Sequence, residues 1–148
     1  MNKIKLKPEH FMKEALKEAE KAKGSDEVPV GAVVVHSDKI IARGHNQVEI
    51  LNDATAHAEI LAITSAMSFT GSKYLNECDL YVSLEPCVMC AGAAFLSKLK
   101  SITFGAYDPK QGFAKKTKGL LPKKVKVKGG VMEEECAGII NAFFQDKR

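Results

Sequence analysis

The chain has 148 residues, of which 45% are hydrophobic and 27% charged, and its formal net charge is +4. This length predicts one domain around a single hydrophobic core, extending over residues 1–148. No apolar run reaches the roughly 18 residues that span a membrane, and no apolar segment follows the lysine-rich start as it would in a signal peptide. We therefore expect a cytoplasmic protein without membrane contact.

Hydrophobic periodicity predicts the elements in chain order. Apolar residues at helical spacing predict a surface helix over 9–23, and two β-branched segments around Ser37-Asp38 predict a hairpin of strands over 30–36 and 39–46. The later elements expected are a helix from near Ala56, a strand over 80–84, a helix over 88–96, strands over 101–105 and 125–128, and a helix over 133–147. This alternation predicts an α/β fold with three α/β/α layers: a mixed, mostly parallel five-stranded sheet with helices on both faces, its hairpin forming an antiparallel edge pair.

The most informative motif is His57-Ala58-Glu59 together with Pro86-Cys87-Val88-Met89-Cys90. One imidazole and two thiolates, from His57, Cys87 and Cys90, predict three ligands for Zn²⁺ and a fourth position for water, whose pKa the metal lowers towards about 7. Glu59 has no ligand role, so we expect it to take the proton of that water and pass it to a leaving nitrogen. Hydrolytic release of ammonia needs this set of groups.

The spacing of the motif also constrains the backbone. Residues two apart on a regular helix point about 200° away from each other, so His57 and Glu59 cannot both face one metal from a helix interior. We therefore expect His57 in an irregular first turn, and the two cysteines of the motif at the start of a second helix, where the helix dipole stabilises thiolates. Two helix N-termini should converge on one zinc.

Each part of this motif has a weaker alternative. A Cys-x-x-Cys pair alone also fits a redox pair, half of a structural zinc site or two core cysteines. Its combination with His-x-Glu, after a predicted strand-to-helix turn, favours a catalytic zinc. The two remaining cysteines, Cys78 and Cys136, are expected to be buried structural thiols.

Positive charge is concentrated between Lys110 and Lys128, where eight of nineteen residues are lysine and none is acidic. Such a segment attracts phosphate backbones by releasing counterions, without sequence preference. A solvated loop kept soluble by its charge explains the composition equally well. Phe143 and Phe144 offer stacking faces for an unpaired base, although their helical spacing predicts that at least one belongs to the core.

The motifs together resemble the bacterial tRNA-specific adenosine deaminases, members of the cytidine deaminase-like zinc superfamily. The resemblance covers nearly the whole chain and rests on Glu27 to Ala32, Gly44-His45-Asn46, Thr55 to Glu59, Leu80 to Ala93, Phe104-Gly105-Ala106 with Asp108 and Lys110, Glu135-Cys136-Ala137, and Phe143-Phe144 with Arg148. It implies one zinc per subunit on His57, Cys87 and Cys90, with Glu59 as proton shuttle. The implied reaction converts the wobble adenosine of a tRNA anticodon to inosine.

The resemblance also implies the substrate contacts. Asn46 matches an amide that pairs with the purine edge, and the positions matching residues near a bound anticodon stem-loop are Ala58, Asp108, Lys110, Phe144 and Arg148. Family members are homodimers whose active sites lie near the subunit interface, so a homodimer is implied.

Two departures from the family pattern occur. Ala54 stands where the family usually has proline. The segment after Gly112 is shorter than usual, and Ala114-Lys115-Lys116-Thr117-Lys118 replaces a stretch that normally begins a helix. A truncated helix there would change RNA docking, with the lysines compensating by charge.

Two alternatives to a tRNA deaminase stay open at this stage. The same zinc core serves deaminases of free guanine, cytosine or a nucleoside, because a fold does not fix the substrate. Such enzymes gain nothing from a basic segment, which favours RNA. A zinc-stabilised RNA-binding protein without catalysis would need a fourth Cys or His ligand to close its zinc site, and Glu59 would have no role in it.

Overall fold

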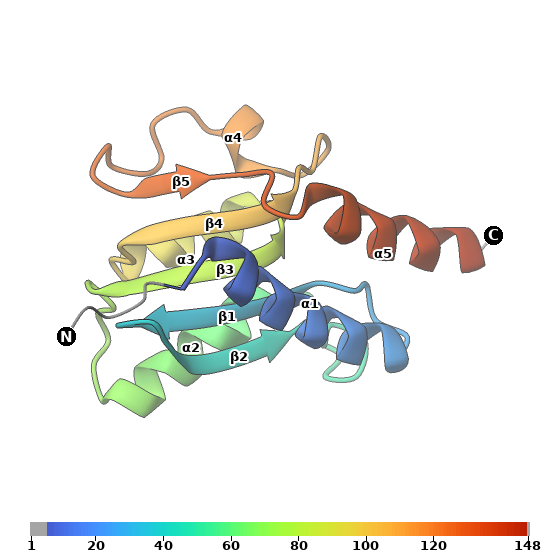
Figure 1. Cartoon of the computed structure of the whole chain (residues 1–148), viewed down its shortest axis with the longest axis horizontal. Helices are drawn as coiled ribbons and strands as arrows, with labels where there is room; N and C mark the ends of the chain where they lie inside the picture. The colour runs from blue at the N-terminus through green and yellow to red at the C-terminus, as the bar shows by residue number, and fades with distance from the viewer. Residues whose placement is uncertain (1–5, 148) are drawn as a thin grey trace.

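The computed structural model describes residues 6–147 and has five strands and five helices in that range. In chain order they are α1 (Pro8–Gly24), β1 (Gly31–His36), β2 (Lys39–His45), α2 (Ala58–Thr70), β3 (Cys78–Leu84), α3 (Val88–Leu96), β4 (Ser101–Ala106), α4 (Phe113–Lys116), β5 (Lys126–Lys128) and α5 (Glu133–Asp146) (Figure 1). The predicted elements are therefore confirmed, with boundaries within two residues. The hairpin turn at Ser37 and Asp38 has φ of 49° and 63°, as a two-residue type I′ turn requires.

The strands form one sheet in the order β2-β1-β3-β4-β5. The hairpin forms the antiparallel edge, as predicted, and β3, β4 and β5 run parallel. The expectation of a mostly parallel sheet is wrong, because β1 also pairs antiparallel with β3. After β2 the chain crosses over β1 through α2, so that β3 runs in the direction of β2 and opposite to its neighbour β1. Two of the four neighbouring pairs are thus antiparallel.

Helices cover both faces of the sheet, which confirms the three-layer α/β/α architecture (Figure 1). Along β1, Ala32 and Val34 belong to the core under α2 and α3, whereas Val33 and Val35 pack with Phe11 of α1 on the other face. Successive side chains of a strand point to opposite faces. The unbroken apolar run of β1 therefore reflects burial on both sides. A further cluster joins α1, α5 and β4.

The topology brings the carboxyl ends of β2, β3 and β4 to one end of the sheet, where ligands of open α/β sheets bind. There α2 approaches β2 closely, because a β-carbon on Gly44 would lie 2.5 Å from the carbonyl oxygen of Ala58. Only glycine permits this contact, which sets the height of the first turn of α2 above the sheet. Among residues 6–147, no helix is both long and apolar enough to cross a membrane.

The segment that connects β4 to β5 contains no long helix. Its only helix, α4, has four residues, and the chain then runs through an extended connection to the three-residue β5. The truncation suggested by Ala114-Lys115-Lys116-Thr117-Lys118 is therefore present. The expectation for Cys78 and Cys136 is also confirmed, because both are free and buried, and burial raises the pKa of the Cys136 thiol to about 12.

Candidate metal centre and substrate pocket

His57 and Cys87 occupy equivalent positions at the starts of two helices. His57 is the N-cap of α2 and Cys87 is the N-cap of α3, both with extended backbone, and Cys90 lies in the first turn of α3. The predicted irregular first turn for His57 is confirmed, and the two helix N-termini converge as expected. Because the N-terminal end of a helix carries partial positive charge, both thiols lie where the thiolate is favoured.

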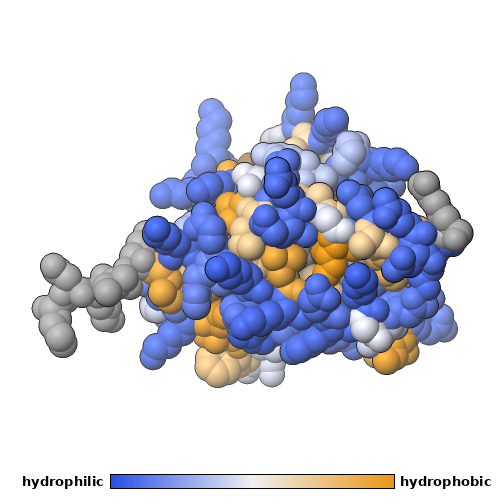
Figure 2. Space-filling view, turned by 45° about the vertical axis from the view of Figure 1, so that its right-hand side comes forward, coloured by the Kyte–Doolittle hydropathy of each residue, from blue (hydrophilic) through white to orange (hydrophobic). Residues whose placement is uncertain are grey.

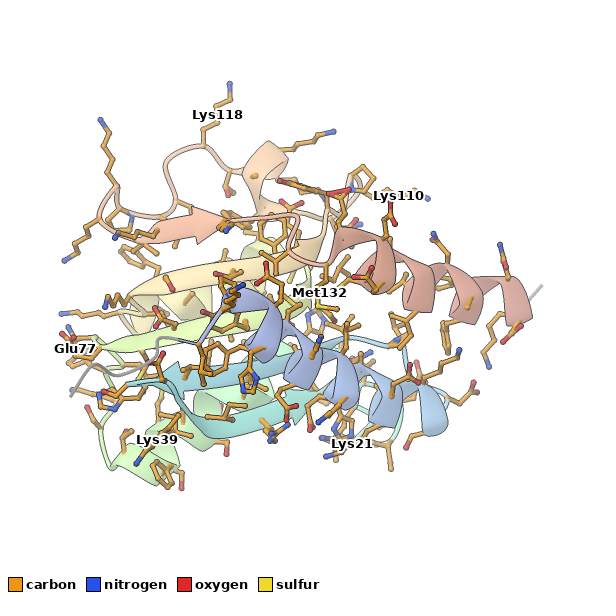
Figure 3. The ribbon with its side chains drawn as sticks, viewed as in Figure 1. Lys21, Lys39, Glu77, Lys110, Lys118 and Met132 are labelled. Atoms are coloured by element: carbon orange, nitrogen blue, oxygen red, sulfur yellow. The ribbon has the colours of Figure 1, made fainter. Side chains whose placement is uncertain are left out.

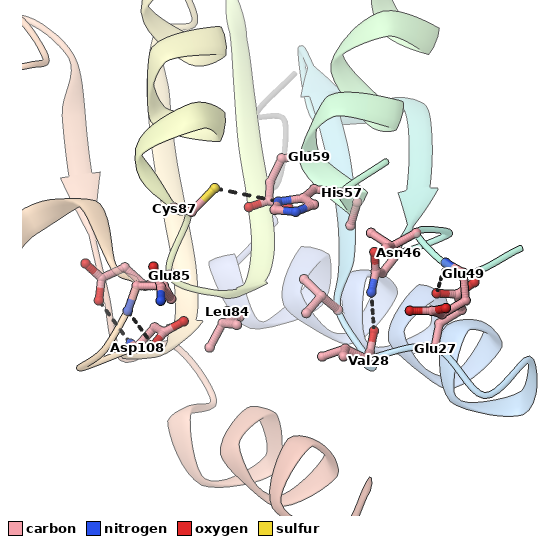
Figure 4. A pocket seen from close by; sticks show the side chains of 14 residues that line it. Glu27, Val28, Asn46, Glu49, His57, Glu59, Leu84, Glu85, Cys87 and Asp108 are labelled. Carbon is pink, nitrogen blue, oxygen red and sulfur yellow. Dashed lines mark hydrogen bonds between the residues drawn. The ribbon is translucent and has the colours of Figure 1, made fainter. Parts of the chain in front are cut away.

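The three predicted ligand atoms lie at distances that suit one tetrahedral ion. His57 Nδ1 lies 3.6 Å from Cys87 Sγ (Figure 4). It lies 3.5 Å from Cys90 Sγ, and all three donors are within 4.8 Å of one another. Zinc–nitrogen and zinc–sulfur bonds of about 2.0 and 2.3 Å at the tetrahedral angle give a nitrogen–sulfur separation of about 3.5 Å. Borderline-soft donors of this kind are those that zinc prefers. The site therefore fits Zn²⁺.

Electrostatics at the centre also call for a cation. Hydrogen bonds with Cys90 and His57 lower the pKa of Cys87 to about 3, so this thiol ionises readily. The pKa of Cys90 is raised far above its usual range by the hydrogen bond with Cys87, by burial and by the nearby Glu59. The imidazole alone supplies too little positive charge for two thiolates and a carboxylate. A divalent cation between the sulfur atoms compensates this excess of negative charge.

Glu59 lies in the first turn of α2, beside the metal ligands, and its side chain is almost fully buried (Figure 4). Burial raises the pKa of its carboxyl group to about 7, a change that the positive charge of His57 opposes. A carboxyl group with such a pKa both accepts and donates protons near neutral pH. Glu59 thus has the environment expected of an acid–base residue.

The metal centre forms one wall of a cavity of about 450 Å³. Of the residues predicted from the sequence, this cavity is lined by Asn46, His57, Ala58, Glu59, Cys87 and Asp108. Asn46 donates from Nδ2 to the carbonyl oxygen of Val28 at 3.2 Å, but its buried Oδ1 has no partner. Since buried polar atoms are nearly always hydrogen-bonded, this oxygen is an acceptor available to a ligand.

A second cavity, of about 780 Å³, adjoins the first and shares Val28, Leu84, Asp108 and Gln111 with it. Lys110 and Phe144 line this second cavity rather than the metal pocket. Phe144 is 48% exposed whereas Phe143 is buried, so one of the two rings belongs to the core, as predicted. Arg148 lies outside the described residues. The two cavities together form a continuous surface from the metal centre to α5.

Comparison with known proteins agrees with this site. Residues 6–106 match the model of the cytidine and deoxycytidylate deaminase zinc-binding region. The chain is also 47% identical over 145 residues to the tRNA-specific adenosine deaminase of Bacillus subtilis, a match that covers 95% of this chain and 90% of that protein. The chain belongs to the tRNA-specific adenosine deaminase family.

Solved structures of related deaminases share the fold of this family. A structure from a study of A-to-I editing by tRNA:A34 deaminases superposes with a TM-score of 0.82 and 42% identity, covering 88% of this chain and 98% of that chain. The guanine deaminase of Bacillus subtilis gives a TM-score of 0.66 and 39% identity over 69% of this chain and 66% of its own. The same deaminase architecture is therefore found in proteins named for two different activities, tRNA deamination and guanine deamination.

Two buried carboxylates, those of Glu27 and Glu85, bind backbone N–H groups in the walls of the pocket. Neither residue was predicted as a site residue. Glu27 accepts the backbone N–H groups of Glu49 and Ile50 at 2.9 and 2.8 Å (Figure 4). On the opposite wall Glu85 accepts those of Asp108 and Ala114. Both carboxylates line the cavity and are more than nine-tenths buried. In the sequence their only signal is an acidic residue within a predicted apolar context.

Proposed function

We propose that residues 1–148 form a single zinc-dependent deaminase domain that converts the wobble adenosine of a tRNA anticodon to inosine and releases ammonia. One observation carries this proposal: an open three-ligand metal centre with a buried carboxylate lies in a cavity that continues into a second one. A free base would occupy only the first cavity. A nucleotide within an RNA loop needs room for its neighbours as well.

The residues of the metal centre divide the chemistry between them. His57, Cys87 and Cys90 would hold one Zn²⁺ ion, which when bound lowers the pKa of a water to about 7. The Glu59 carboxylate takes the proton of the attacking water and delivers it to the amino nitrogen of the base. A bond from oxygen to purine C6 forms and the bond from C6 to nitrogen breaks. Adenosine and water thus become inosine and ammonia.

Substrate recognition follows from the lining of the two cavities. Asn46 Oδ1, which has no partner in the protein, accepts a hydrogen bond from an N–H of the bound base. The small, buried side chain of Ala58 leaves space for a purine beside the metal centre. Phe144, about half exposed in the second cavity, offers a face on which a neighbouring base stacks.

Charged groups near the second cavity complete the proposed contacts. Asp108 lies on the wall that both cavities share, within reach of the base and of its neighbour. Lys110 lines the second cavity, where its ammonium group neutralises a phosphate. Arg148, at the end of the sequence, is assigned a phosphate contact from the family pattern alone.

We also propose a homodimer and a cytoplasmic location. The outer side of α3 is apolar and exposed at Val88, Met89, Phe95 and Leu96, with Leu96 72% exposed. Large exposed apolar side chains grouped on one helix are typical of a subunit interface. Because α3 also carries two metal ligands, a second copy there would lie next to the site. A reducing compartment keeps the four free thiols of the chain from forming disulfides.

A deaminase of free guanine or cytosine is the second candidate. The first cavity is large enough for a free base, and the similarity to a guanine deaminase is consistent with this activity. A non-catalytic zinc-stabilised RNA-binding protein is less well supported. The metal cluster in the described residues has three donors rather than four, and Glu59 is buried beside it.

A side-by-side assay of ammonia release distinguishes these functions. The zinc-loaded protein is incubated with an anticodon stem-loop carrying adenosine at the wobble position, with free guanine, with cytosine and with adenosine. We expect release from the stem-loop, and no release from any substrate after chelation of the metal. Rapid turnover of guanine or cytosine with none of the stem-loop would establish the second candidate. No turnover of any substrate by metal-replete protein would favour the non-catalytic alternative.

A further inference from the structure

The net positive charge of the protein comes from one segment of the chain. Residues 110–128 contain eight lysines and no acidic residue, and the rest of the chain contains fourteen lysines and arginines against eighteen aspartates and glutamates. The formal charge of +4 is therefore the difference between +8 on this segment and −4 on everything else. A polyanion is attracted to the segment and repelled, on average, by the rest of the surface.

In the fold this charge forms a surface along one edge of the sheet. We call it the lysine face; it consists of Lys115, Lys116, Lys118, Lys123, Lys124, Lys126 and Lys128, all exposed, on α4, on β5 and on the connection between them. Since β5 is the last strand of the sheet, the lysine face follows its outer edge. Figure 3 shows Lys118 projecting from this edge, on the side opposite to Lys39. Figure 2 shows hydrophilic side chains projecting from the same upper edge.

The lysine face begins at the metal pocket. Phe113, the first residue of α4, donates its N–H to the carbonyl oxygen of Pro86 at 3.0 Å, and Gly112 forms an isolated antiparallel bridge with the zinc ligand Cys87. Immediately before it, Lys110 lines the second cavity. A ligand that leaves the two cavities along this segment therefore meets lysines as the only charged residues that the segment itself contributes.

We propose that the lysine face binds the phosphate backbone of the paired stem of the RNA whose loop enters the catalytic pocket. This inference rests on the proposed function and extends it from the loop to the stem. The two cavities accommodate the loop nucleotides, whereas the lysine face continues past them to the connection before β5, so only a longer ligand reaches its far end. Flexible ammonium groups neutralise phosphates without reading bases, as contact with a stem of variable sequence requires.

The structure also indicates how to remove this charge without disturbing the pocket. Lys116 donates to Gln111 Oε1 at 2.9 Å, and Gln111 lines both cavities, so this lysine is left in place. The test variant carries Lys115→Ser, Lys118→Ser and Lys123→Ser. A matched control carries three serines at exposed lysines elsewhere: Lys7→Ser, Lys13→Ser and Lys39→Ser.

Equilibrium binding is measured on the zinc-loaded proteins as a function of salt. One RNA is a stem-loop with inosine at the wobble position, which prevents turnover, and the other is a single strand containing the loop nucleotides only. For the stem-loop, the slope of log K against log salt should become less steep by about 2 to 3 in the test variant, at roughly 0.7–0.9 for each of the three phosphates that the variant no longer neutralises. The control variant should match the wild type. The loop-only RNA should show no difference between the test variant and the wild type.

Two outcomes would overturn the inference. An unchanged slope for the stem-loop would leave the lysine face with a role in solubility, and an equal loss for the loop-only RNA would assign these lysines to the loop instead of the stem. Failure of the proposed function has a different signature, since the wild-type protein would then release no ammonia from a wobble-adenosine stem-loop, whatever the binding slopes.

Discussion

Glu85 fills the space in which a side chain at Gly112 would have to lie. A β-carbon on Gly112 would be 2.3 Å from Cδ of Glu85 and 2.4 Å from its Oε1. The same carboxylate accepts the N–H of Asp108 at 3.1 Å and that of Ala114 at 3.2 Å, one on each oxygen. The loop that joins β4 to α4 therefore closes around the buried carboxylate of Glu85. Glu85 directly precedes the metal-binding motif in the sequence.

Gly112→Ala should displace this loop while leaving the metal ligands in place. A methyl group at this position collides with Glu85, and overpacking of this kind costs about 1–3 kcal/mol of stability. We expect a drop of about tenfold or more in kcat/KM for the stem-loop, with one zinc per subunit retained. Gly24→Ala is the matched control, because a β-carbon there has no neighbour within 4 Å. Wild-type kinetics in Gly112→Ala would show that the loop tolerates the displacement.

Glu85→Gln tests the same loop without adding volume. The two oxygens of Glu85 accept separate N–H groups, whereas glutamine offers one acceptor and turns an NH₂ group towards the other N–H. A buried donor without a partner costs about 1–3 kcal/mol. We expect KM for the stem-loop to rise more than kcat falls, with no change in metal content. Equal kinetics for Glu85→Gln and wild type would remove Glu85 as a positioning residue.

Glu59→Gln should abolish ammonia release while the protein keeps its fold and its zinc. The amide cannot carry a proton from water to the leaving nitrogen, and loss of general acid–base catalysis typically costs about 10²–10⁴ in rate. Metal analysis and circular dichroism establish that the site and fold persist. Glu49→Gln serves as the control, since Glu49 lines the same cavity but is exposed. Retained activity in Glu59→Gln would exclude this residue from proton transfer.

Asn46→Ala should weaken recognition of the base. The variant removes the buried acceptor Oδ1, which has no partner within the protein, and so leaves a substrate N–H unpaired at a cost of about 1–3 kcal/mol. That cost corresponds to roughly a 5- to 150-fold loss in kcat/KM. Steady-state kinetics on the stem-loop measure it, with Gln47→Ala as the neighbouring control. An unchanged kcat/KM would show that Asn46 does not contact the base.

Glu14 provides a test of stability against pH that is independent of the active site. Its hydrogen bonds, first with Lys17 and then with Arg43, lower the pKa of Glu14 from 4.5 to about 2. Because the folded-state pKa lies below the unfolded one, the stabilisation is fully present above about pH 4.5 and is lost as pH falls towards 2. Its partners are exposed, so solvent screening limits the effect to about 1 kcal/mol at pH 7.

We therefore expect Glu14→Gln to lower the free energy of urea unfolding at pH 7 by this amount. The difference from wild type should shrink as pH falls below 4.5. Glu20→Gln, an exposed acidic residue on the same helix, should show no such difference at any pH. A constant difference between Glu14→Gln and wild type across this range would show that packing, rather than charge, accounts for the effect.

The sequence alone determined the metal ligands and the secondary structure around them. His57 and Glu59, and likewise Cys87 and Cys90, are close along the chain, so their spacing and the helix starts beside them are local properties. The same holds for the hairpin at Ser37-Asp38, whose turn depends on two residues. The chemistry of an open zinc with an acid–base carboxylate could therefore be predicted without the fold.

The tertiary structure decided which distant backbones meet. The antiparallel pairing of β1 with β3, the second cavity against α5 and the lysine face along β5 all depend on the order of strands in the sheet. Glu27 and Glu85 bind backbone N–H groups 22 to 29 residues away. An isolated glutamate in a sequence carries no sign of such a partner, because only packing of the whole chain brings a buried carboxylate to the unpaired N–H groups of a loop.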